Sequence, residues 1–167
     1  GVGAAAAPDA ALLARWRGQL EQGQDGLAAL AGCQKIRIHG DYHLGQTLKA
    51  DGDFFLFDFE GEPARPLAER RRKGTALQDV GGMLRSFGYA AHTAAQPEWE
   101  GAARAAFLKA YRAAIADAPV RLAPAEDGGF AAACRFFERE KAVYELAYER
   151  NNRPEWVSIP LAALRRM

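Results

Sequence analysis

The chain has 167 residues, 49% of them hydrophobic, and its 22 Lys and Arg residues nearly balance 21 Asp and Glu residues, for a net charge of +1. This length predicts one globular domain with enough apolar residues for a sizeable core. The near-neutral charge excludes a general electrostatic attraction to nucleic acid or to an anionic membrane surface, while a local charged patch stays compatible with it.

The cysteines and the hydropathy pattern indicate the cellular environment in which the protein is expected to fold. Cys33 and Cys134 lie far apart and lack the paired spacing of a zinc site or a disulfide framework, so a reducing, cytoplasmic setting is expected. No apolar run approaches the roughly 20 residues of a membrane span, and the opening GVGAAAAPDA lacks the basic leader of a signal peptide. We therefore expect neither a nucleic-acid partner nor a membrane anchor.

The first part of the chain predicts a helix and then a small β element. Leu and Trp residues recur at helical spacing from Asp9 to Ala31, with Gly23 as the expected point of a break. Residues 35–57 contain two β-type runs, KIRI and FFLF, on either side of QTLKA. An Asp-Gly turn separates QTLKA from FFLF, which predicts a hairpin.

The rest of the chain predicts helices. After a Pro- and Arg-rich loop over 63–74, Thr75 and Gln78 form the T-x-x-Q pattern of a capping box at a helix start. Pro97 opens a second helix, which ends by Pro119. A last long helix over about 129–150 is apolar on more than one side, so we expect it to be central. The predicted fold class is mainly α with a small β element (α+β).

Two polar loops flank the β element, and their residues suit phosphoryl transfer. HGDYHLGQ contains Asp41 and, five residues further on, Gln46, and DFEGEP contributes Asp58 beyond the hairpin. Phosphoryl transfer requires a carboxylate that orients the acceptor hydroxyl and takes its proton, and oxygen ligands for the Mg²⁺ on the phosphates. Kinase-like folds place these groups in an H-x-D-x-x-x-x-N loop and in the Asp of a D-F-G motif.

These loops resemble those of small-molecule phosphotransferases with a kinase-like fold, in which HGD replaces the HRD of protein kinases. More narrowly, four segments taken in order resemble the bacterial maltokinases of the aminoglycoside-phosphotransferase superfamily, including those fused to trehalose synthase. The four segments are HGDYHLGQ, DFEGEPARPLAERR, DVGGMLRSF and EKAVYELAYERNNRPEW. The similarity extends from about Arg37 to the C-terminus.

The resemblance implies ATP-dependent phosphoryl transfer to the anomeric hydroxyl of maltose, which gives maltose 1-phosphate for α-glucan (glycogen) synthesis. It implies ATP and Mg²⁺ as cofactors, maltose or a related sugar as the substrate, and a fused or associated trehalose synthase as a partner. It also implies that residues 1–167 are the C-terminal lobe of a protein-kinase-like fold. The N-terminal nucleotide-binding lobe would then lie elsewhere in the same polypeptide, and the isolated chain would have little or no activity.

The resemblance also assigns roles in the two loops. Asp41 becomes the catalytic carboxylate, and Gln46 and Asp58 become the Mg²⁺ ligands, although Gln46 replaces the usual Asn. Glu60 stands where D-F-G has Gly. Further loop residues that could support the metal or the substrate are His39, His43 and Glu60.

Four residues outside the loops complete the expected site. Asp79, at a helix start, resembles the Asp that accepts hydrogen bonds from the catalytic-loop backbone in kinase folds, a position that the helix dipole also favours. Lys141, Tyr144 and Tyr148 are spaced i, i+3 and i+7 along the last long helix, so they share one stripe of it. Aromatic faces and charged groups suit a sugar, but core packing explains the two tyrosines equally well.

Other function classes stay open. GDYHLG is similar to the G-D-x-H-G motif of metallophosphoesterases, yet Leu44 stands where that motif has Gly, and three His residues are too few for a two-metal centre. A non-catalytic interaction or regulatory module of a larger trehalose or α-glucan enzyme is a second alternative. A kinase-like phosphotransferase with another small-molecule acceptor is a third.

Overall fold

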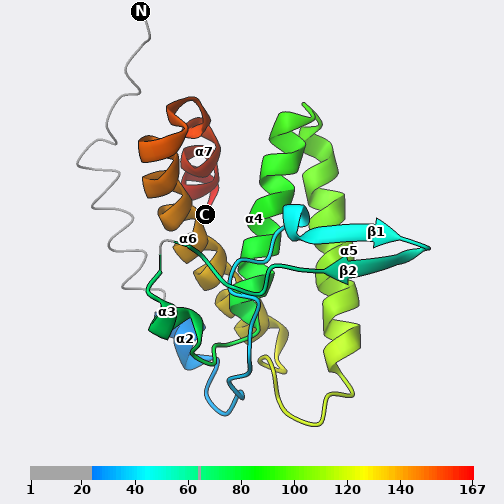
Figure 1. Ribbon diagram of the computed structural model, residues 1–167. Coiled ribbons are helices and arrows are strands. Elements are labelled where there is room, and N and C mark those ends of the chain that lie inside the picture. The colour runs from blue at the N-terminus through cyan, green and yellow to red at the C-terminus, as the bar shows by residue number, and fades with distance from the viewer. Residues whose placement is uncertain (1–23, 64) are drawn as a thin grey trace, which may run out of the picture.

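A computed structural model describes residues 24–63 and 65–167, and it is mainly helical with one two-stranded sheet (Figure 1). The predicted α+β class is therefore confirmed. The elements in chain order are α2 Gln24–Ala28, η1 Leu44–Gln46, β1 Thr47–Ala50, β2 Asp53–Leu56, α3 Leu67–Arg70, α4 Leu77–Thr93, α5 Pro97–Ile115, α6 Asp127–Asn152, η2 Pro154–Trp156 and α7 Ser158–Arg166. None of the described helices is long and apolar enough to cross a membrane.

Helix α6 is central, as its apolar pattern predicted, because α2, α4, α7 and η2 all pack against it. The main core lies between α4 and α6, and α5 covers the other side of α4 (Figure 1). Apolar side chains from these helices make up this core, and they are Leu77, Val80, Met83, Leu84, Phe87, Phe130, Ala133, Cys134 and Phe137.

Two adjacent glycines let α4 approach its neighbours closely. A Cβ atom at Gly81 would lie 2.8 Å from the carbonyl carbon of Phe137 in α6, and one at Gly82 would lie 2.7 Å from the carbonyl oxygen of Tyr42. Both distances are shorter than real Cβ contacts, so the backbones of α4, α6 and the HGD loop touch at this point. The helices thereby form a rigid floor under the HGD loop.

The hairpin forms as predicted between β1 and β2. Thr47 pairs with Leu56 and Ala50 pairs with Asp53, and the turn residues Asp51 and Gly52 have φ values of 53° and 83°. A two-residue turn with positive φ at both positions is the form that Asp-Gly favours. The hairpin extends away from the helices (Figure 1), so both of its faces are exposed.

Three local predictions need correction. The run KIRI is not a strand, because Ile36 makes only a single β-bridge with Gly74. In the described part of the first predicted helix, α2 ends at Ala28, three residues before the expected end, and residues 9–23 lie outside the described residues. The capping box is not formed as expected: Thr75 Oγ1 accepts only a long 3.4 Å bond from the Leu77 amide, although a helix does begin there.

Candidate active site

The two polar loops are in direct backbone contact at a pair of glycines. Gly40 and Gly61 have φ values of 84° and 77°, which residues with a Cβ atom rarely adopt. A Cβ atom at Gly40 would lie 3.1 Å from the Cα atom of Gly61. The HGD loop and the DFEGEP loop therefore meet where neither tolerates a side chain.

Asp79 fixes the backbone of the HGD loop. Its Oδ2 atom accepts a hydrogen bond from the His39 amide at 2.8 Å, and its Oδ1 atom accepts one from the Gly40 amide at 2.9 Å. Burial raises the pKa of Asp79, although these backbone bonds oppose the shift. The predicted residue thus lies where a supporting carboxylate for this loop should lie.

His39 joins the two loops rather than facing a substrate. The ring is buried, and its Nδ1 atom accepts a hydrogen bond from the Asp41 amide at 3.3 Å. The Nε2 atom must then carry the proton, and it lies 2.8 Å from the carbonyl oxygen of Phe57, to which it donates. The ring also packs against Phe59 at 4.7 Å between centroids. His39 therefore orients Asp41 and the segment before Asp58.

Asp41 is held by a lysine that lies 100 residues away in the sequence. Lys141 Nζ on α6 donates to Asp41 Oδ1 at 3.0 Å and to Glu62 Oε1 at 2.5 Å. Burial acts to lower the pKa of Lys141, but the two carboxylates outweigh burial and raise it, so the side chain is an ammonium ion. His43 Nε2 lies 3.9 Å from the other Asp41 oxygen, Oδ2.

Gln46 and Asp58, the predicted metal ligands, lie side by side. Gln46 Nε2 donates to Asp58 Oδ2 at 2.8 Å, and Asp58 has a φ of 62°, a conformation unusual for Asp. Within 24–63 and 65–167, no group of three or more His, Cys, Asp or Glu side chains could hold a metal ion. Mg²⁺, however, needs only one or two protein oxygens when substrate phosphates and water supply the rest, so this pair fits it.

The other two predicted support residues differ in their placement. Burial lowers the pKa of His43, and the carboxylates of both Asp41 and Asp58 act in the opposite sense, so His43 lies within electrostatic range of the two loops. The Glu60 side chain is 82% exposed and has its carboxylate 3.9 Å from Arg70. Glu60 lines neither of the two cavities that Asp41 lines.

The predicted sugar-contact residues share a cavity with Asp41. This cavity, which we call the acceptor cavity, has a volume of about 450 Å³ and includes Asp41, His43, Lys141, Tyr144 and Tyr148 in its walls. The Tyr144 and Tyr148 rings are stacked with centroids 6.5 Å apart, and Lys141 Nζ lies 5.0 Å from the Tyr144 ring centroid. The three predicted residues on α6 thus line the same cavity as the expected catalytic carboxylate, Asp41.

Two buried carboxylates in the acceptor cavity were not predicted. Glu145 Oε2 accepts from Arg85 Nε at 2.8 Å, and burial raises the pKa of Glu145 although Arg85 opposes this. Glu149 accepts two bonds from Arg153, at 2.8 and 2.7 Å, and one from the Tyr89 hydroxyl at 3.0 Å. Both glutamates follow Lys141 at intervals of four residues, so helical periodicity could have identified them.

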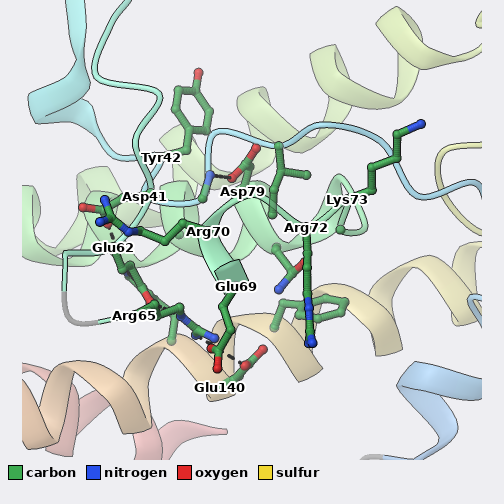
Figure 2. Close-up of a pocket in the computed structure, with 18 residues that line it drawn as sticks. Asp41, Tyr42, Glu62, Arg65, Glu69, Arg70, Arg72, Lys73, Asp79 and Glu140 are labelled. Carbon is green, nitrogen blue, oxygen red and sulfur yellow. Dashed lines mark hydrogen bonds and ion pairs between the residues drawn. The ribbon is translucent and has the colours of Figure 1, made fainter. Parts of the chain in front are cut away.

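A second, smaller cavity lies on the other side of Lys141. It has a volume of about 230 Å³, and we call it the basic cavity because Arg65, Arg70, Arg72 and Lys73 line it (Figure 2). Asp41 and Lys141 line both cavities. The two cavities therefore meet at the Asp41–Lys141 pair and at Gly82, which also lines both.

Comparison with known proteins finds that this chain is similar to glucosamine kinases. No family model matches the chain. It is 34% identical to a glucosamine kinase of Streptacidiphilus jiangxiensis over 80% of this chain and 32% of the relative, and 30% identical to one of Mycolicibacterium smegmatis over 83% and 36%. The chain thus spans about a third of the length of the curated relatives it matches.

The solved structures that resemble this chain also include glucosamine kinases. A glucosamine kinase in complex with glucosamine, ADP and inorganic phosphate superimposes with a TM-score of 0.79 at 29% identity, over 96% of this chain and 42% of that one. Another crystal form of a glucosamine kinase gives a TM-score of 0.77 at 30% identity, over 95% and 41%. The family expected from the sequence, the maltokinases, is therefore wrong, and the inferred trehalose synthase partner loses its support.

Proposed function

We propose that this chain is the acceptor-binding part of an ATP-dependent kinase that phosphorylates an amino sugar, with glucosamine as the first candidate. The observation that carries the proposal is the acceptor cavity, in which Asp41 shares one hollow with Tyr144, Tyr148 and the buried Glu145. The similarity to glucosamine kinases agrees with it.

Asp41 is the group suited to act on the acceptor hydroxyl. Its carboxylate borders the cavity, and the Lys141 ammonium and the His39 ring fix its orientation through Oδ1 and the backbone amide. A carboxylate held in this way orients the hydroxyl for attack on the terminal phosphate and accepts its proton. Gln46 and Asp58 would hold Mg²⁺, which neutralises charge on the phosphates when bound.

The cavity favours an amino sugar over a neutral one. An amino group that carries a proton is attracted to carboxylates, and the three acidic side chains of the cavity wall outnumber its two basic ones, Lys141 and Arg153. Arg85 occupies Oε2 of Glu145, and none of the hydrogen bonds found among the described residues uses Oε1. The stacked Tyr144 and Tyr148 rings offer apolar faces to the C–H surface of a sugar ring.

The chain would form the C-terminal lobe of a protein-kinase-like fold, with most of the nucleotide-binding surface supplied by another part of the native polypeptide. Two features support this division. The matched glucosamine kinases are about three times as long as the region that aligns with this chain. The exposed β1–β2 hairpin also presents large apolar side chains, among them Leu48 and Phe54, that suit contact with a further lobe.

The proposal is tested with the native polypeptide that contains this chain. With ATP and Mg²⁺, glucosamine should be phosphorylated, as followed by phosphorus NMR of the product, and glucose and maltose should be poor acceptors. Glu145→Gln should raise the KM for glucosamine by about tenfold, since one charged contact is worth about 1.4 kcal/mol or more. The exposed Glu155→Gln should leave it unchanged.

Two results would contradict this function. Phosphorylation of maltose with no reaction on glucosamine would assign the cavity to a neutral sugar. Binding of glucosamine without any phosphoryl transfer by the wild-type polypeptide would leave the chain as an interaction module.

A further inference from the structure

Glu62 is a buried carboxylate next to the catalytic loop, and none of the roles above uses it. Its residue is only 4% exposed, and it follows Gly61 at the point where the two polar loops touch. The contact between Gly40 and Gly61 therefore brings Glu62 beside Asp41, although 20 residues and the hairpin separate them in the sequence.

Glu62 is bound by two cations, one on each oxygen. Lys141 Nζ donates to Oε1 and Arg65 Nε donates to Oε2, both at 2.5 Å. Because Lys141 also donates to Asp41, the four side chains form a row of alternating charge in the order Arg65, Glu62, Lys141, Asp41. Figure 2 shows Glu62 between Asp41 and Arg65 on the wall of the basic cavity.

Stability alone does not explain this arrangement. Burying a carboxylate is expensive even when it is paired, and apolar residues of similar volume often stabilise a protein as well or better. Lysine is a point charge on a flexible four-carbon stem, so one contact to Asp41 would leave its ammonium group free to shift. A second hydrogen bond, to the buried Glu62, restricts this freedom.

Glu62 acts from outside the acceptor cavity. Asp41 and Lys141 line both cavities, whereas Glu62 lines only the basic cavity. A sugar in the acceptor cavity would therefore contact Asp41 and Lys141 but not Glu62.

We propose that Glu62 is a positioning residue for phosphoryl transfer, which clamps the Lys141 ammonium through a second hydrogen bond beside the one to Asp41 and so holds the Asp41 carboxylate in its working orientation. The reaction in this inference rests on the proposed function, whereas the clamp itself is a property of the geometry.

Glu62→Gln tests the clamp, because it keeps the size of the side chain and removes its charge. In the native polypeptide it should lower kcat for the sugar by up to about 100-fold, the loss expected from a misplacement of about 1 Å, with little change in the KM for ATP. Glu62→Asp keeps the charge and should recover part of kcat. Glu69→Gln removes an exposed carboxylate of the same cavity and should leave kcat unchanged.

A double substitution separates positioning from a general structural role. If Glu62 acts through Lys141, adding Glu62→Gln to a Lys141→Met variant should cause almost no further loss of kcat. Equal losses of kcat in both backgrounds would overturn the proposal. So would a fall in kcat for Glu62→Gln that is fully accounted for by a lower fraction of folded protein in circular dichroism.

Chemical modification tests the clamp without any kinase activity. Reductive methylation of Lys141, followed by mass spectrometry, should be several-fold faster in Glu62→Gln than in the wild type, and unchanged in Glu69→Gln. An unchanged rate at Lys141 in Glu62→Gln would refute the clamp. Failure of the wild type to phosphorylate any sugar, with the methylation result as expected, would refute only the proposed function.

Discussion

At the scale of single residues, the site depends on a few charged groups that fix one another. Asp41 receives an amide-to-imidazole contact through its own backbone and an ammonium contact through its side chain. The His39 ring and the Lys141 side chain are both largely buried, so their hydrogen bonds to Asp41 are stronger than they would be at the surface. The carboxylate is therefore held before any substrate arrives.

Asp41→Asn should separate chemistry from nucleotide binding. The amide keeps the shape of the side chain and can still accept a bond from Lys141, but it cannot take a proton. We expect kcat of the native polypeptide to fall by about 10²- to 10⁴-fold, with the ATP dissociation constant nearly unchanged, as measured by steady-state kinetics and calorimetric titration. Near-normal turnover would remove Asp41 from the catalytic role, and the exposed Asp117→Asn is the matched control.

Sequence reasoning named candidate residues in motifs and along one face of α6, and it did not identify Glu62. HGDYHLGQ and DFEGEP predicted Asp41, Gln46 and Asp58, since their local spacing is that of kinase-like loops. Glu62 lies in the same segment, yet its role depends on a bond to Lys141, 79 residues further on. No periodicity or short motif reports a contact over that distance. The proposed amino-sugar acceptor rests on the similarity to glucosamine kinases, which the loop motifs alone did not indicate.

At the scale of elements, the close approach of α4 to α6 sets the floor of the site. Gly81 is the residue that permits it, because a Cβ atom there would lie 2.8–2.9 Å from backbone atoms of Phe137 and Glu138. Backbone atoms inside a helix cannot move aside as a flexible side chain can. The same contact supports the part of α6 that precedes Lys141.

Gly81→Ala should therefore destabilise the protein even though alanine favours helices. Overpacking of this kind costs about 1–3 kcal/mol, more than the gain of about 1 kcal/mol in helix propensity. Gly101→Ala in α5 is the control, since no atom lies within 4 Å of the added Cβ, and it should stabilise by about 0.5–1 kcal/mol. Urea unfolding curves measure both values. A neutral or stabilising Gly81→Ala would show that the two helices can separate at little cost.

Element prediction succeeded for the long helices and for the hairpin with its Asp-Gly turn, and it failed for the isolated run KIRI. The 26-residue α6 and the start of α5 at Pro97 follow from extended apolar spacing and from a proline that suits the first turn. KIRI has the composition of a strand, but a strand requires a partner, and only Ile36 finds one, at Gly74. The segment KIRI therefore has β propensity but lacks the neighbouring strand that it would need to form one.

At the scale of the whole molecule, the β1–β2 hairpin is the most exposed apolar feature among residues 24–63 and 65–167. Leu48, Phe54 and Phe55 are 58%, 65% and 56% exposed, and the hairpin stands away from the helices (Figure 1). Contiguous apolar surface of this kind marks an interaction site on soluble proteins. Its position next to Gln46 and Asp58 places that surface beside the expected phosphate end of the nucleotide.

Phe54→Lys combined with Phe55→Lys tests this surface. The 167-residue chain should bind a hydrophobic dye, and the double variant should bind several-fold less, with an unchanged circular dichroism spectrum because neither side chain belongs to the core. In the native polypeptide the same variant should weaken ATP binding. Leu67→Lys changes an exposed apolar residue in α3 and should alter neither dye binding nor ATP binding. Equal dye binding by the wild type and the double variant would refute this assignment.

The continuity of α6 limits how this cavity can change in evolution. Lys141, Glu145 and Glu149 stand on successive turns of one unbroken helix, so their spacing along its axis is set at about 6 Å per step. Inserting one residue would rotate every later side chain by about 100° and remove all of them from the cavity together. Relatives that accept larger or smaller acceptors should therefore differ in the loop around Pro63 or in the identity of these side chains, and keep the length of the helix.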